Sequence, residues 1–525
     1  MKRLSFIILV CIGAMQLAQG QTKELSGFKT FSSRAISSIR DGKEVKGYTV
    51  FYKSDKADKK NDNYHIAVYD ENLEEVKTLN LQKPRDKFML VGNAYNGQLI
   101  AFCFYNGKEK KLEYEAYDMG LVKKASAIKP HELSNVESAT LTSLSSENEK
   151  DQGGTMGVDM NLHAVNGKGF VSMGYLKNGR GYTIEMRDND LKKKWEYESE
   201  KDGDDYQGFM LMEVTDKYII GNLAKRPGLM SKKMTFYIAV FDVETGKKIA
   251  EVPAEATTKE RLSLTTVMYD PTTDEIFAIG DYYLEKDKPN VSKSQGFYLK
   301  TFDVFGKEKS KQFYPWQKSL KGALPPEAKE SLEKGANNFT HKILRGSDGK
   351  IYLVCEQFST GTDGWGIASN VLNGGYGASM TKAVVWNMLV IGLNPDFTIN
   401  DIKFYPKQKS NVTLPPGADF YGKGMIGTMV KYMGGFDYQF TQTANDRKSF
   451  DVVYVNYDKE KGESEKRILG NIIISPDGKF NVDKIDITSK ASSSFLYPAK
   501  PGYLMMVDYL KKEKNIGMKL IKLNY

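Results

Sequence analysis

The chain has 525 residues, a formal net charge of +9 at pH 7 and only three cysteines. Its negative mean hydropathy and its wealth of tyrosine and phenylalanine are typical of a soluble, strand-rich protein and do not match a membrane-embedded helical bundle. The lysines are spread along the chain among Asp and Glu, so no basic block predicts a nucleic-acid-binding face.

Residues 1–20 have the features of a secretory signal peptide. Met1 to Arg3 carry positive charge, and Leu4 to Leu17 form an apolar run that is too short for a transmembrane helix. Ala18 to Gly20 place small residues where a signal peptidase cuts. The sequence therefore predicts an exported protein, periplasmic or on the cell surface, with no transmembrane segment in the mature chain.

A recurring strand that ends in Asp follows along the chain. In each copy apolar residues alternate with others, an aromatic or apolar residue precedes the Asp, and a lysine-rich strand comes after a turn. Period-two alternation predicts a half-buried strand, and an Asp side chain can start a turn by accepting a hydrogen bond from the backbone two residues on. The Asp residues of these copies are Asp70, Asp118, Asp188, Asp242 and Asp303, with looser copies at Asp396 and Asp477.

A more apolar run precedes most copies. These runs lack alternation, so we expect burial on both faces, as in the inner strand of a repeated unit. They are residues 97–102, 169–174, 216–221, 274–280 and 349–354. Cys103 and Cys355 lie in or next to two of them, and we expect both to be free, buried thiols; a single disulfide between them is the alternative.

An inner, a middle and a charged outer strand together give the layout of a β-propeller blade. The sequence therefore predicts an all-β fold: residues 21–525 form one β-propeller-like domain of roughly seven (six to eight) blades. Short helical and Gly-rich insertions are expected near residues 315–340, where Pro325 and Pro326 open a helix, and near residues 359–382. The last strands, from Tyr503 onward, are expected to pair with a strand near Phe28 to Ile39 and close the ring.

Ile474 to Lys479 resembles the Ser-Pro-Asp-Gly-Lys turn of TolB-type propeller repeats. In architecture and composition, most of the chain resembles uncharacterised exported propeller-like proteins of Gram-negative bacteria. The resemblance implies a propeller in the bacterial cell envelope. It contains no functional motif, so it implies no activity.

Motifs for catalysis, cofactors or metals are not found in the sequence. The four histidines, His65, His131, His163 and His341, show no metal-binding spacing. Gly169 to Gly174 does not match a nucleophile elbow, and Gly422 to Gly424 is not set as a phosphate loop. The acids of Glu200 to Asp205 do not have the spacing of a calcium loop. No catalytic, cofactor-binding or metal-binding residue is predicted.

Gly361 to Gly377 is a glycine-rich stretch with one charged residue, Asp363. A mobile loop here would present Trp365 and Tyr376 to a partner, and these two residues are the predicted binding residues. The alternative is an ordinary flexible insertion. A second aromatic and glycine-rich stretch, Asp419 to Tyr438, is a candidate to pack beside it.

The leading functional hypothesis is a non-enzymatic binding or scaffold protein of the cell envelope, with an envelope protein or a glycan as partner. A propeller enzyme that acts on glycans, a hydrolase or a lyase, is one alternative, because paired carboxylates meet only in the fold. An outer-membrane β-barrel, a single closed sheet, is the other. Ile521, Leu523 and Tyr525 alternate as in a last barrel strand, but the lysine-rich strands lack an uncharged lipid-facing row.

The signal peptide gives the first testable prediction. Export removes residues 1–20, so the exported protein begins at Gln21. N-terminal sequencing of the protein recovered outside the cytoplasm checks the cleavage point. An exported protein that still begins at Met1 contradicts it.

Overall fold

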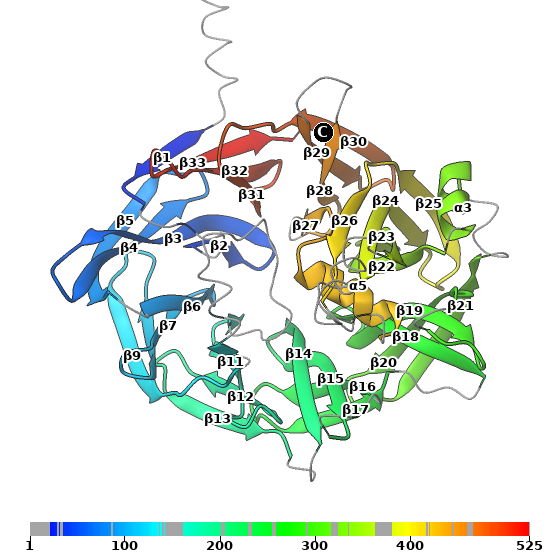
Figure 1. Cartoon of the computed structure of the whole chain (residues 1–525), viewed down its shortest axis with the longest axis horizontal. Helices are drawn as coiled ribbons and strands as arrows, with labels where there is room; N and C mark the ends of the chain where they lie inside the picture. Colours follow the sequence, from blue (N-terminus) through cyan, green and yellow to red (C-terminus); the bar gives the residue numbers. More distant parts are fainter. Residues whose placement is uncertain are drawn as a thin grey trace, which may run out of the picture.

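In the computed structural model, eight antiparallel β-sheets are arranged as the blades of a ring (Figure 1). The blades have four strands each, and one of them carries a fifth. The structure describes residues 21–28, 31, 35–85, 88–135, 137–138, 141, 161–200, 205–228, 231, 234–254, 259–289, 292–316, 324–333, 335–362, 381–415, 418, 421–443, 446–458 and 466–523.

In blades 1 to 7 the first four strands follow one another in chain order, from the centre of the ring outward, and in blade 8 the first strand of the chain is the outermost. Blade 1 contains β2 (Ile36–Asp41), β3 (Glu44–Lys56), β4 (Asn61–Asp70) and β5 (Glu75–Pro84). Blade 2 contains β6 (Phe88–Tyr95), β7 (Ile100–Asn106), β8 (Lys111–Tyr117) and β9 (Lys123–Pro130). Blade 3 contains β10 (Leu162–Val165), β11 (Gly169–Tyr175), β12 (Tyr182–Arg187) and β13 (Lys193–Glu198). Blade 4 contains β14 (Tyr206–Val214), β15 (Tyr218–Arg226), β16 (Thr235–Asp242) and β17 (Lys248–Pro253).

The second half of the ring continues the same order. Blade 5 contains β18 (Glu260–Asp270), β19 (Glu275–Leu284), β20 (Gly296–Asp303) and β21 (Glu308–Pro315). Blade 6 contains β22 (Asn337–Arg345), β23 (Ile351–Thr362), β24 (Thr381–Leu393) and β25 (Ile399–Tyr405), with β26 (Ser410–Thr413) paired to β24. Blade 7 contains β27 (Tyr438–Thr443), β28 (Phe450–Asp458), β29 (Lys466–Ile474) and β30 (Phe480–Asp486). Blade 8 contains β31 (Ser493–Pro498), β32 (Tyr503–Leu510), β33 (Asn515–Lys522) and β1 (Thr22–Ser26).

The predicted all-β propeller is confirmed, but the ring has eight blades where the sequence predicted roughly seven. The apolar runs expected to be inner strands are the second strands of their blades. The true innermost strands escaped the repeat pattern because many of them, such as β6 and β10, mix buried with partly exposed residues. The alternative of a single closed sheet is wrong, because the strands form eight separate sheets.

Burial between neighbouring blades explains the apolar second strands. All seven residues of β7 are buried. Phe102 and Phe104 pack against blade 1, whereas Ala101 and Cys103 pack against blade 3. Each second strand is covered on both faces because a blade stands on either side of it, and this arrangement removes the need for alternation.

The recurring Asp lies in the turn between the third and the fourth strand, as predicted. Asp70 Oδ1 accepts hydrogen bonds from the backbone N–H of Asn72 and of Glu74, both at 2.8 Å. Asp303 Oδ1 does the same for Phe305 at 3.1 Å and Lys307 at 2.9 Å. The carboxylate therefore accepts hydrogen bonds from the backbone N–H groups that have no other partner within the tight turn.

The ring is closed by pairing between the two ends of the chain. The outermost strand of blade 8 is β1, which pairs antiparallel with β33. The prediction that Phe28 to Ile39 supplies this strand is wrong, since Ile36–Asp41 is instead the innermost strand of blade 1. The closing strand was missed because alternate residues of β1 are exposed, and it has no apolar run.

Cys103 and Cys355 are free and buried, as predicted. Burial raises the pKa of each thiol to about 12, so both behave as small apolar side chains. They lie in β7 of blade 2 and β23 of blade 6.

Two helices whose bounds lie within the described residues interrupt the repeat of strands. The predicted helix after Pro325 is α3 (Pro326–Glu333), and Gly335 follows it at φ +86°. The other helix, α5 (Lys423–Tyr432), connects blade 6 to blade 7 and lies on the inner side of the ring (Figure 1). Within the described part of the chain, neither helix nor any other is long and apolar enough to cross a membrane.

Ring closure gives the second prediction. Phe28 is fully buried between blades 8 and 1, where its ring stacks on Tyr52 with centroids 4.2 Å apart. Phe28→Ala should lower the free energy of unfolding by about 3–5 kcal/mol, because it leaves a cavity where the ring is closed. Chemical denaturation measures the change. Phe305→Ala is the control: Phe305 is 74% exposed, and its loss should change stability by less than about 0.5 kcal/mol. Equal losses in the two variants contradict the closing role.

Candidate functional site

The two faces of the ring differ. One face, here called the turn face, carries the short turns that join first to second strands and third to fourth strands. The opposite face, here called the insertion face, carries the starts of the first and third strands. It also carries α3, α5 and the free ends of the β23–β24 hairpin at Thr362 and Thr381. Long connections are concentrated on the insertion face, so a binding site is most readily built there.

The predicted binding residues Trp365 and Tyr376 lie outside the described residues. The described arms of their hairpin reach the insertion face and contact α5. Lys423 donates a hydrogen bond to Thr360 Oγ1, and the rings of Phe358 and Phe436 have centroids 5.9 Å apart. The second aromatic and glycine-rich stretch therefore packs beside these arms.

Glycines bring α5 close to the innermost strands. A Cβ atom at Gly424 would lie 2.5 Å from the carbonyl oxygen of Leu264 in β18, and one at Gly427 would lie 2.5 Å from the Phe339 ring in β22. The N–H of Gly424 also donates to Ser263 Oγ at 3.1 Å. Sequence reasoning missed this helix because glycine is a poor helix former, and here the close contact compensates.

A cavity of about 220 Å³ lies between α5 and blades 3, 4 and 5. Its lining is largely aromatic and apolar, with a few polar groups: Tyr175, Gly208, Phe209, Met210, Asn222, Ala224, Phe236, Ser263, Leu264, Tyr421, Gly422, Met425 and Thr428. A Cβ atom built on Gly208 meets nothing within 4 Å, so this position faces open space. An apolar cavity of about 150 Å³ is enough to bind benzene, and this one has room for a larger aromatic group.

One polar group in the cavity is ready to receive a ligand. The side-chain carbonyl oxygen of Asn222 is buried and has no hydrogen-bond partner among the described residues. The other polar groups are used within the protein: Ser263 Oγ accepts from Gly424, and Thr428 Oγ1 donates to the Gly424 carbonyl oxygen at 3.0 Å. A ligand with one hydrogen-bond donor would satisfy Asn222, since a buried acceptor without a partner is costly.

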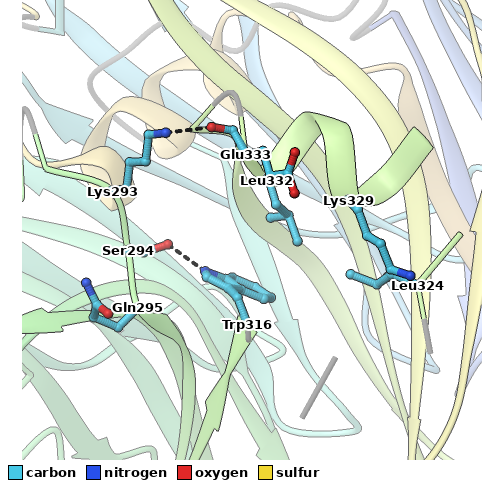
Figure 2. A pocket seen from close by; sticks show the side chains of 8 residues that line it. All are labelled: Lys293, Ser294, Gln295, Trp316, Leu324, Lys329, Leu332 and Glu333. Atoms are coloured by element: carbon cyan, nitrogen blue, oxygen red, sulfur yellow. Dashed lines mark hydrogen bonds between the residues drawn. The ribbon is translucent and has the colours of Figure 1, made fainter. Parts of the chain in front are cut away.

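A second pocket of about 330 Å³ lies between α3 and the segment that leads into β20 (Figure 2). Trp316 Nε1 donates to Ser294 Oγ at 2.9 Å, and Lys293 Nζ donates to the Glu333 carbonyl oxygen at 2.5 Å. These donors are satisfied inside the protein, so this pocket is the weaker candidate.

A buried ionic cluster joins blade 6 to blade 7. Glu356 accepts from Lys407 at 2.8 Å, from His341 at 3.1 Å and from the backbone N–H of Asp437 and Tyr438, both at 3.2 Å. Lys407 also contacts the Asp437 carboxylate. Burial alone would raise the pKa of Glu356, but the charge of Lys407 and the bond to His341 lower it below its usual value.

The cluster has a structural role: it holds blade 6 and blade 7 together. The side chains of Glu356 and Lys407 have no exposed surface, so a substrate cannot reach them. Elsewhere in the described ranges, no group of three or more His, Cys, Asp or Glu side chains is placed to hold a metal ion.

This cluster gives the third prediction. Lys407→Met should lower the free energy of unfolding by about 3–5 kcal/mol, because it leaves buried carboxylates unpaired. Lys479→Met is the matched control, since Lys479 forms an exposed pair with Asp477 at 2.6 Å and should change stability by about 0.5 kcal/mol or less. Urea denaturation of both variants measures the difference. If Lys407→Met is as stable as Lys479→Met, the cluster does not hold the two blades together.

Comparison with solved structures finds chains of low sequence identity, one of which is a β-propeller domain. The β-propeller domain of the Trilobed protease from Pyrococcus furiosus is 10% identical, with a TM-score of 0.35 over 88% of this chain and 97% of that one. Prolyl oligopeptidase B from Galerina marginata is 9% identical, with a TM-score of 0.39 over 94% of this chain and 56% of that one. A PL25 ulvan lyase, a polysaccharide lyase, is 9% identical, with a TM-score of 0.37 over 82% and 91%. At this level the similarity transfers no activity.

Comparison of sequences gives a family but no activity. No curated protein matches the chain. A family model matches residues 1–524, which is nearly the whole sequence. The chain therefore belongs to DUF6770, a family of unknown function.

Proposed function

We propose that this chain is an exported, non-enzymatic binding protein of the cell envelope, and that its ligand enters the cavity beside α5. The cavity itself is the observation that carries the proposal: about 220 Å³, lined mostly by aromatic and apolar side chains, with one unpartnered acceptor. A concave apolar site with a few fixed polar groups is the usual form of a small-molecule site. The signal-peptide features at residues 1–20 support the compartment.

The walls of the cavity favour a planar ligand. Phe209, Phe236 and Tyr421 supply aromatic surface, and Met210 and Met425 supply flexible thioether chains that adapt to a ring. The volume suits a bicyclic aromatic group, and Asn222 suits a hydroxyl or N–H on it. An envelope protein or a glycan as the natural partner stays a prediction.

The fourth prediction tests the cavity with 2-naphthol, a neutral bicyclic aromatic with one hydroxyl donor. We expect saturable binding in a fluorescence titration. Gly208→Leu should weaken it at least about tenfold, because the new side chain occupies the open space at Gly208. The variant should unfold no earlier than the parent, since replacing a strand glycine reduces the entropy of the unfolded chain.

Gly517→Leu is the matched control. Gly517 also lies in a strand and also faces open space, but in blade 8. It should bind 2-naphthol as the parent does. If Gly208→Leu binds the probe as well as Gly517→Leu does, the cavity is not the binding site and the proposal fails.

A further inference from the structure

Four basic residues lie on or next to the innermost elements of the ring. Arg40 lies on β2, Lys43 in the turn after it, Lys342 on β22 and Lys431 in the last turn of α5. All four side chains are exposed. Arg40 and Lys342 come from innermost strands and Lys431 from a helix on the inner side of the ring, whereas Lys43 lies in a turn at the end of the innermost strand β2.

Lys342 lies close enough to both Lys43 and Lys431 to repel them. Burial and the charge of Lys342 lower the pKa of Lys431 to about 8. Burial also lowers the pKa of Lys43, with further lowering by Arg447 and Lys342. The strands and the helix that surround these ammonium groups disfavour their charged form, although part of each side chain reaches solvent.

The positive charge is only partly balanced. Arg40, Lys342 and Lys431 form no ion pair with any residue that the structure describes, whereas nearby Arg345 pairs with Asp270 at 2.8 Å. Lys431 lies over the Phe339 ring, 5.7 Å from its centroid. Glu213 offsets part of the charge of Lys43 and Lys342, and Asp270 also acts on Lys43. No carboxylate of the described residues acts on Lys431, so its ammonium group is a site of favourable potential for an anion.

The helix connects these charges to the cavity. Thr428 lines the cavity, and Lys431 follows it three residues later on α5. Residues three apart on a helix lie on the same face, with Cβ atoms about 5–6 Å apart. A ligand ring seated against Thr428 and Met425 would therefore hold a charged substituent within reach of Lys431.

We infer that the ligand of this cavity is an organic anion, an aromatic carboxylate whose ring fills the cavity and whose carboxylate meets Lys431 and Lys342. This inference rests on the proposed function, because it adds a charge to the ligand of the same site. It accounts for two features at once: an apolar cavity of about 220 Å³ and unpaired cations one helical turn away.

The test compares 2-naphthoate with 2-naphthol, two probes of similar size that differ in charge. We expect the full chain to bind 2-naphthoate about tenfold more tightly, because hydrogen bonds to a charged group are stronger than those to a neutral one. Lys431→Met keeps the apolar stem but removes the charge. It should weaken 2-naphthoate about tenfold and leave 2-naphthol unchanged. Raising the salt concentration should reduce the affinity for 2-naphthoate only.

The control is Lys329→Met, which removes a lysine from the other helix, α3, at the second pocket. It should leave both probes unaffected. The inference is overturned if the two probes bind with equal affinity, or if Lys431→Met weakens both equally. In either case the proposed function still holds, provided that 2-naphthol binds and that Gly208→Leu weakens its binding. If neither probe binds, the proposed function and the inference fail together.

Discussion

Packing of one blade on the next is the interaction on which the rest of this structure depends. A four-stranded blade has two apolar faces and cannot bury both by itself. The second strands show this most clearly, as in β7, where adjacent residues point to different neighbouring blades and all are buried. Every blade therefore needs two neighbours, and the ring must close. Pairing of β1 with β33 and the packing of Phe28 between blades 8 and 1 meet that need.

The same constraint decides where variation is tolerated. The faces of the blades pack on neighbouring blades, so inserted loops, helices and extra strands are confined to the ends of the strands. Blade 6 carries most of them: its hairpin β23–β24 extends beyond the ring, β26 adds a fifth strand, and α5 follows. The ionic cluster around Glu356 and Lys407 ties this enlarged blade to blade 7. A buried ion pair is weak evidence for added stability, but its geometry fixes how the two blades meet.

The candidate site is a consequence of that enlargement. Blades 3, 4 and 5 supply three walls of the cavity, and α5 supplies the fourth because Gly424 and Gly427 let it approach β18 and β22. The helix also carries Lys431 toward Lys342 on the innermost strand β22. Apolar and charged features thus become neighbours through one short helix, although the residues concerned are far apart in the sequence.

Features that depend on local patterns can be predicted from the residues alone. These features are the Asp turns, the helix after Pro325, the apolar second strands and the two buried thiols. Each follows from residues close together in the chain, because turn geometry and burial on both faces produce local sequence patterns. The number of blades and the positions of the innermost strands could not be predicted in this way, because residues that face a solvated centre lack apolar periodicity. The closing strand β1 and the helix α5 could not be predicted either, because contacts between distant parts of the chain stabilise them. The strand pairs with residues almost 500 positions away, and the glycines of the helix contact distant strands. Asn222, Thr428 and Lys431 look ordinary in the sequence, because what distinguishes them is an unpartnered oxygen, a shared cavity and a nearby like charge, and each of these exists only after the ring has closed.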